Sequence, residues 1–260
     1  MHGVAKRLVE EWLLGLGRIT LLARDAVASL VTLRVTWRDF IRQLYFIGVK
    51  SQTVVVVTGA FTGMVLCVMT YYQLHKVKTD SATLAVVSIT MCSELGPVLT
   101  ALMVAGRVGA SMAAELGTMK VTEQIDALRT LATHPVDYLV VPRLLASVVA
   151  LPLLTAGSIT VGILSAYAVG VYMMGIDPAY SFPNMVKHTA DSDVFIGIIK
   201  AFVFGGMIAI IGCYKGMNCR EGAEGVGRAT TEAVVASSIL VLISNFFLTL
   251  TLSRLFHIYD

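Results

Sequence analysis

The sequence predicts an all-α integral membrane protein, and three observations lead to that class. Hydrophobic residues make up 56% of the 260 positions, and the mean hydropathy is +0.78. Only 14% of the residues are charged, whereas ordinary soluble domains carry roughly 25%. Five apolar runs approach or exceed the about 20 residues that a membrane-spanning helix needs. We therefore expect one domain over residues 1–260, built mainly from transmembrane helices.

Residues 1–50 are amphipathic rather than uniformly apolar. Leu8, Trp12, Leu16 and Ile19 recur at spacings of three and four, which places them on one face of a helix. The same segment holds eight Lys and Arg residues. We expect an interfacial helix that lies on the membrane with its cations near anionic headgroups. The alternative is a solvated linker.

The transmembrane bundle is predicted over residues 53–252. Its five spans are expected at 53–73, 83–106, 144–174, 195–213 and 233–252, and the second helix is expected to continue beyond the bilayer. If the N-terminus is cytoplasmic, the inner segments hold fifteen Lys and Arg residues and the outer segments five, with Lys200 counted among the five. This imbalance predicts a cytoplasmic N-terminus and a C-terminus on the opposite side.

Glu94 and Pro97 lie about midway along the second predicted span. Proline lacks an N–H group, so the carbonyl of Ser93 loses its helical partner and the helix is expected to kink. A free carbonyl beside a carboxylate predicts a polar notch at membrane depth, where ionisable groups are usually functional. The alternative is a structural carboxylate bonded to a neighbouring helix.

The first two predicted spans and the helix that continues the second also contain a motif of small residues and a charged pair. Gly59 and Gly63 form a GxxxG motif, which allows close helix contact either inside the protein or across a dimer seam. Arg107 and Glu115 share a helical face and predict a structural Arg–Glu network near the cytoplasmic boundary.

Residues 121–133 predict a short cytoplasmic helix of about three turns, which Thr122 could cap. Val121, Ile125, Leu128 and Leu131 form an apolar stripe along it. Such a stripe suits the groove of a partner protein, although the helix could instead lie on the protein's own spans.

Chemistry by this chain itself is not expected. The five histidines are isolated, and no metal-binding or nucleophile motif occurs. The four scattered cysteines, Cys67, Cys92, Cys213 and Cys219, are expected to be free thiols. We therefore predict no catalytic residue and no metal site, and any nucleotide hydrolysis has to come from another chain.

Three blocks of the sequence resemble the MlaE (YrbE) permease family. They are the stretch from Glu94 to Leu128, the segment HPVDYLVVPR at 134–143 and the segment GRATTEAVVASS at 227–238. Members of that family are membrane subunits of ABC transporters that move phospholipids and other lipids between bacterial membranes together with MCE-domain proteins. The resemblance extends over nearly the whole chain.

The resemblance implies a set of partners and a location. It implies a homodimer in the bacterial inner membrane, two cytoplasmic ATPase subunits that bind ATP and Mg, and a periplasmic ring of MCE-domain proteins. Some systems of the family add a STAS-domain subunit. The C-terminus would then be periplasmic, and the transporter would maintain the lipid asymmetry of the outer membrane. Nucleic acid is not among the expected partners.

The resemblance also assigns residues. Glu94 matches the acidic residue of the family's ExGP motif beside a lipid cavity, whose apolar walls we expect from neighbouring positions on spans one and two. The segment 121–133 matches the coupling helix that contacts the ATPase. Two positions depart from some family members, which have a basic residue in place of Ser93 and of Glu232. The expected lipid-contacting residues are Glu94, Leu95, Pro97, Leu99, Val65, Leu66 and Met69, and the expected ATPase-contacting residues are Glu123, Gln124, Asp126 and Leu128.

Two other functions compete with the lipid permease. An ion-coupled carrier or channel would use Glu94 as its ion site and would need no ATPase, but five spans without an inverted repeat argue against it. An intramembrane enzyme would need at least two catalytic groups at membrane depth, and the sequence offers only Glu94 there.

Overall fold

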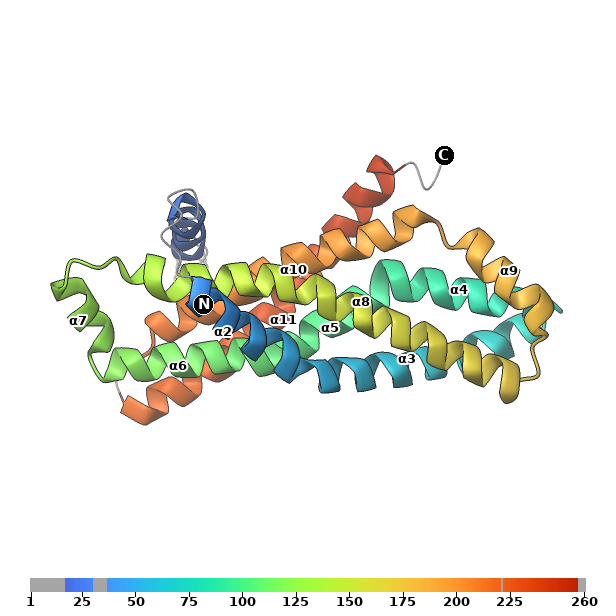
Figure 1. The fold of residues 1–260 in the computed structure, drawn as a ribbon, viewed down its shortest axis with the longest axis horizontal. Coiled ribbons are helices and arrows are strands. Elements are labelled where there is room, and N and C mark those ends of the chain that lie inside the picture. The colour runs from blue at the N-terminus through green and yellow to red at the C-terminus, as the bar shows by residue number, and fades with distance from the viewer. Residues whose placement is uncertain (1–16, 30–36, 221, 257–260) are drawn as a thin grey trace, which may run out of the picture.

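A computed structural model describes residues 17–29, 37–220 and 222–256 of the chain. The predictions for residues 1–16 and 30–36, including Leu8, Trp12 and Leu16, lie outside this part. The described part consists of helices joined by turns, without a strand (Figure 1). Five helical stretches in it are long and apolar enough to cross a membrane. The predicted class, an all-α membrane protein with five spans, is therefore confirmed.

The five helical stretches are longer than the predicted spans, and each of the first three consists of shorter helical segments joined end to end. The first stretch runs over Trp37–His75 and comprises α2 (Trp37–Leu44), a π turn and α3 (Lys50–His75). The second runs over Asp80–Val121 as α4 (Thr83–Thr90), α5 (Gly96–Val104) and α6 (Ala110–Val121). The third ends in α8 (Val141–Tyr172), and the fourth and fifth are α10 (Asp191–Met217) and α11 (Gly222–Leu255).

Two short helices lie at opposite ends of the elongated bundle (Figure 1). The first, α7 (Gln124–Thr130), follows α6 at one end. The second, α9 (Pro178–His188), covers the other end between α8 and α10 and was not predicted from the sequence. It begins where the carboxylate of Asp177 accepts a hydrogen bond from the backbone N–H of Ala179, at 2.9 Å, which caps the helix.

Residues 17–29 form a helix that rests on the α7 end of the bundle. Ala26 is fully buried in the main core, and Leu22 packs against that core. The hydroxyl of Ser29 donates a hydrogen bond to the carboxylate of Asp137, in the π turn that precedes α8. This part of the N-terminal segment is therefore attached to the start of the third span.

Glycines in the core of the bundle bring neighbouring helices into direct backbone contact. Gly59 and Gly63 of α3 face Ser158 and Gly162 of α8, and a Cβ atom at either α3 glycine would overlap the backbone of α8. The GxxxG motif therefore serves contact within one chain, which settles the two alternatives for these residues.

Replacement of Gly63 by alanine is expected to destabilise the protein. The added methyl group would collide with the carbonyl oxygen of Gly162, and overpacking of this kind costs about 1–3 kcal/mol. Unfolding of the purified protein in mixed micelles measures the change. Gly157→Ala is the matched control, because no atom lies within 4 Å of the position of its new Cβ. Equal stability of the two variants would contradict the close packing of α3 on α8.

Candidate functional site

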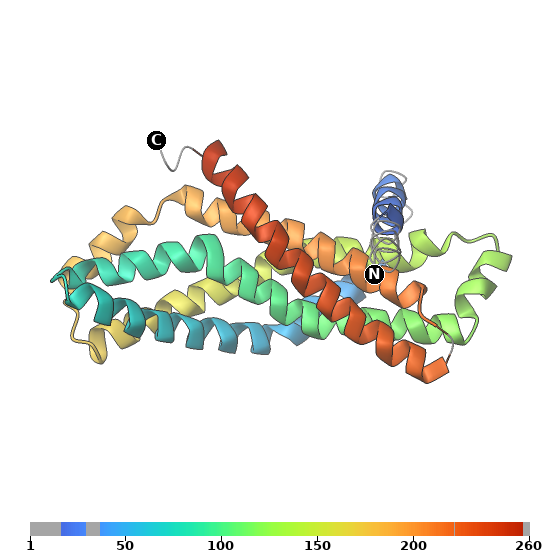
Figure 2. The same ribbon diagram turned by 180° about the vertical axis from the view of Figure 1, so that it is seen from behind.

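The second span is interrupted where the sequence predicts a kink. A π turn, Met91–Leu95, separates α4 from α5, and Pro97 lies in the first turn of α5. The two helices meet at a bend (Figure 2). Because Pro97 has no N–H group, the carbonyl of Ser93 is free for another donor. That carbonyl accepts a hydrogen bond from the Lys200 ammonium group, at 2.9 Å, so the carbonyl is not free and a side chain from α10 fills the predicted polar notch. The alternative prediction, a carboxylate bonded to a neighbouring helix, describes Glu94.

Lys200 is completely buried, and each of its three ammonium protons has an acceptor. Besides the carbonyl of Ser93, the Nζ atom lies 2.7 Å from Glu94 Oε1 and 2.8 Å from Thr249 Oγ1. A buried cation is tolerated at membrane depth only with such partners. Lys200 thereby joins α10 to the π turn of the second span and to α11.

Glu94 receives bonds from both neighbouring helices. Besides Lys200, the hydroxyl of Thr249 lies 2.9 Å from Oε1, and the amide nitrogen of Asn245 donates to Oε2 at 3.0 Å. We call Glu94, Lys200, Asn245 and Thr249 the Glu94 network. The Glu94 side chain remains 33% exposed, whereas Lys200 is 0% exposed. The network is therefore buried on the side that faces the core, and it is partly exposed at Glu94 on the surface of the bundle.

The partner of Glu94 was not predicted from the sequence. Lys200 was counted among the cations outside the membrane, and this assignment was wrong, because its side chain is buried inside the fourth span. Four outer cations remain, which strengthens the charge asymmetry. The available signal was the position of Lys200 within the predicted span 195–213, where a lysine requires an acidic partner.

The other expected lipid-contacting residues divide between the surface and the interior. Val65 and Met69 of α3 are exposed on the outside of the bundle, at 59% and 60%. Leu66 and Leu95 are partly buried and pack against a small internal cluster that contains Met91. Leu99 is half-buried, and Pro97 is buried.

Arg107 and Glu115 take different partners, so the predicted Arg–Glu network is wrong for this pair. Arg107 donates to the carbonyl of Phe46 at 2.8 Å and to the hydroxyl of Ser51 at 3.2 Å. Glu115 accepts from Arg143 of α8 at 2.8 Å. The physical reason is distance, because residues eight positions apart lie about 12 Å from each other along a helix, and each side chain has a nearer partner on another segment.

The predicted coupling helix is shorter than expected and is separated from α6. Glu123 adopts a left-handed conformation with φ of 58°, which ends α6 at Val121. Thr122 does not cap α7, because Glu123 occupies the N-cap position and no side chain caps this helix. The hydroxyl of Thr122 donates back to the carbonyl of Thr118 at 2.8 Å. Gln124 instead donates to that hydroxyl at 3.0 Å.

The apolar side of α7 faces the protein's own core. Ile125 is 1% exposed and Leu128 packs against the main core, whereas Leu131 is 74% exposed. Ile125 and Leu128 therefore pack against the protein's own core, as expected if this helix lies on the protein's own spans. Glu123 and Gln124 remain on the surface, where a partner could contact them.

Asp126 fixes α7 to the end of α6. Its carboxylate accepts from Lys120 and from Arg129, each at 2.8 Å. The hydrogen bond from Lys120 and the nearby charges of Lys120 and Arg129 hold the pKa of Asp126 below its usual value. At the same end of the bundle, Glu232 accepts from Lys215 and Arg228, both at 2.9 Å, so this departure from the family pattern has local basic partners.

The fold and the site together define a multi-pass membrane protein with a polar network at membrane depth. The chain belongs to the MlaE permease family, since the model of that family, described as Permease MlaE, matches residues 40–251. This membership places the chain in a family of permeases.

Similar proteins carry permease names. A probable ABC transporter permease protein of Rickettsia conorii is 44% identical over 248 residues, which cover 95% of each chain. Another from Synechocystis is 41% identical and covers 83% of this chain and 82% of its own. The chloroplastic protein TRIGALACTOSYLDIACYLGLYCEROL 1 of Arabidopsis thaliana is 36% identical over 89% of this chain and 66% of its own length.

Removal of Lys200 is expected to destabilise the protein more than removal of the whole ion pair. Lys200→Met leaves Glu94 without its cation, and breaking a buried pair on one side costs about 3–5 kcal/mol. We place the expected cost near the lower end, because Glu94 is partly exposed. A double-mutant cycle of Lys200→Met and Glu94→Leu, followed by unfolding in mixed micelles, measures the coupling. Additive effects would contradict the proposed pairing.

The attachment of α7 is expected to weaken in acid. Because the pKa of Asp126 is lower in the folded protein, its stabilising effect is complete above its unfolded pKa of about 4. It is lost as the pH falls through the folded value. Hydrogen exchange of residues 124–130 should therefore rise in Asp126→Asn at neutral pH and in the unmodified protein only in acid. Unchanged exchange in Asp126→Asn would contradict this assignment.

Proposed function

We propose that the chain is the permease subunit of an ABC transporter that moves phospholipid or a related lipid between the inner membrane and periplasmic MCE-domain proteins. The observation that carries this proposal is the one-third exposure of Glu94 on the outer side of the second span. A carboxylate that faces acyl chains is costly. The surface around Glu94 therefore needs water, a polar ligand or another protein.

The helices beside Glu94 supply an incomplete apolar surface that a second copy could cover. About half of the most apolar stretch of spans two, three and four is buried, against 22% for the first span and 17% for the fifth. Figure 2 shows α11 lying across the front of the bundle. Its exposed residues include Leu242, Phe246 and Leu250. A homodimer formed on this side would enclose Glu94 and leave a cavity for lipid.

Within such a dimer, the two ends of a lipid would meet different surfaces. Exposed Val65 and Met69 of α3 offer apolar contact for acyl chains, with half-buried Leu99 and the partly buried Leu66 and Leu95 beside them. The Glu94 network offers hydrogen-bonding groups for the polar end. Pro97 acts indirectly, since its missing N–H group lets Lys200 bind the second span.

The energy for transport would come from two separate ATPase subunits that bind ATP and Mg. The end of the bundle with α7 is their proposed docking surface, with Glu123 and Gln124 exposed toward the partner. Asp126 and Leu128 contribute by holding α7 on the protein, through Lys120 and through the core. Because α7 follows α6 directly, movement of the ATPases would reach the second span.

This arrangement sets the orientation that we propose. The α7 end, which lies on the side with the excess of Lys and Arg, is cytoplasmic, and the α9 end is periplasmic, where MCE-domain proteins would receive lipid. In a bacterium with an outer membrane, such transport would maintain lipid asymmetry. A STAS-domain subunit is a further candidate partner on the cytoplasmic side.

The direct test of this function is lipid transfer by the complete complex in vesicles. Glu94→Gln keeps the shape of the side chain but removes its charge, and Glu94→Ala removes both. We expect Glu94→Ala to lower the transfer rate at least about tenfold, which corresponds to 1.4 kcal/mol, and Glu94→Gln to lower it less. Leu164→Ala, an exposed position on α8, is the control. Normal transfer by both Glu94 variants would refute the role of this residue.

The docking surface is tested separately by affinity purification from native membranes. We expect Glu123→Lys combined with Gln124→Lys to abolish copurification of the ATPase, because both side chains are exposed and make no contact with the core. Asp191→Lys, a charge reversal at the opposite end, should leave it intact. Retention of the ATPase by the double variant would contradict docking at α7.

A further inference from the structure

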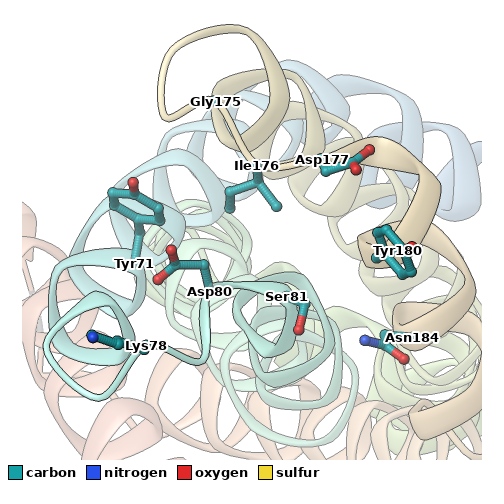
Figure 3. Close-up of a pocket in the computed structure, with 9 residues that line it drawn as sticks. All are labelled: Tyr71, Lys78, Asp80, Ser81, Gly175, Ile176, Asp177, Tyr180 and Asn184. Carbon is teal, nitrogen blue, oxygen red and sulfur yellow. The ribbon is translucent and has the colours of Figure 1, made fainter.

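A cavity of about 420 Å³ lies at the end of the bundle that carries α9 (Figure 3). It is formed where α3 ends, where the second span begins at Asp80 and where the turn after α8 leads into α9. The volume lies within the range of small-molecule sites. The cavity is remote from α7 and from the Glu94 network, so neither role proposed above accounts for it.

The walls of the cavity combine aromatic rings with acidic groups. Tyr71 of α3 and Tyr180 of α9 lie on opposite sides, and Asp80 and Asp177 belong to the segments between them (Figure 3). Tyr180 is 70% exposed, so its ring is available to a ligand. Aromatic faces and carboxylates are the groups that bind organic ammonium ions.

Both carboxylates keep acceptor capacity. Asp177 uses Oδ1 to cap α9 at Ala179, and Asp80 faces the Nδ1 atom of His75 at 3.0 and 3.2 Å. A carboxylate has about four lone-pair sites, so each can accept a further bond from an ammonium group. Ser81 and Asn184 add neutral polar groups to the lining, with Asn184 on the side of Tyr180 (Figure 3).

The one cation among the lining residues does not occupy this space. Lys78 lies at the rim, and its side chain extends away from the other labelled residues (Figure 3). The lining residues other than Lys78 are acidic, aromatic or neutral, which favours a cationic ligand over an anionic one.

We propose that this cavity binds the ammonium group of an amine-bearing lipid headgroup, such as that of phosphatidylethanolamine. The lining residues lie at the ends of three membrane spans, at the level where lipid headgroups are concentrated. Free organic amines share the same chemistry and are the other source of such a ligand. The choice of a lipid rests on the proposed transport function, whereas the ammonium specificity rests on the cavity alone.

The experiment measures lipid retained by the purified full-length chain after incorporation into nanodiscs with equal phosphatidylethanolamine and phosphatidylglycerol. Asp177→Asn removes the charge but keeps a side chain that caps α9 equally well. Tyr180→Leu removes the ring, and Tyr180→Phe keeps it. We expect Asp177→Asn and Tyr180→Leu each to lower the ratio of retained phosphatidylethanolamine to phosphatidylglycerol about fivefold. Tyr180→Phe and Asp191→Asn should leave the ratio unchanged.

Comparing the lipid ratio of each cavity variant with that of the unmodified chain cancels the contribution of lipid bound elsewhere, because the cavity substitutions do not change those other sites. Equal retention of the two lipids, or the same ratio in all variants, would overturn the proposal. If Asp177→Asn fails to fold, Tyr180→Leu still decides, since that side chain is largely exposed.

Competition by tetramethylammonium or ethanolamine distinguishes the two ligand sources. Displacement of phosphatidylethanolamine by either ion would support a site that recognises the ammonium group alone, and resistance to both would support recognition of the intact headgroup. Selective retention without lipid transfer by the complete complex would uphold the site and reject the transport function. Transfer without selective retention would reject the site only.

Discussion

The buried ammonium group of Lys200 is the constraint on which the membrane part of this protein depends. Its three protons need three acceptors away from water, and the chain provides them from the second and fifth spans. The carbonyl of Ser93 is available only because Pro97 cannot donate to it. A glycine contact allows this approach, since a Cβ atom at Gly197 of α10 would overlap the carbonyl of Cys92. The missing N–H group of Pro97, the bend of the second span and the Lys200–Glu94 ion pair therefore depend on one another.

The same arrangement leaves one charged group partly exposed on the surface of the bundle. Glu94 is held by Lys200, Asn245 and Thr249 but keeps an exposed edge beside α11. A carboxylate edge that faces acyl chains is costly. The open edge is the feature that favours a site completed by a second copy and a lipid. An ion carrier is less well supported, because the carboxylate already holds an internal cation.

Much of this structure could be predicted from the sequence, and the failures have physical causes. Hydropathy located all five spans, and the missing N–H group of Pro97 located the notch, because both effects are local. The partner of Glu94 could not be found in this way, since Lys200 lies 106 residues away and was assigned to the membrane boundary. The pairing of Arg107 with Glu115 failed because eight helical residues place them about 12 Å apart, and their actual partners are distant in the sequence. The cap of α9 by Asp177 was a local signal that was overlooked.

The central claim is that a second copy covers the Glu94 side of the bundle. Cysteine cross-linking in native membranes tests it most directly, with Leu242→Cys placed one turn before Asn245 on the exposed face of α11. The control is Leu164→Cys on α8, which is similarly exposed, and the unmodified chain gives the background from its own four cysteines. The account predicts a covalent dimer at position 242 and none above background at position 164. A monomer at position 242, or equal cross-linking at both positions, would contradict it.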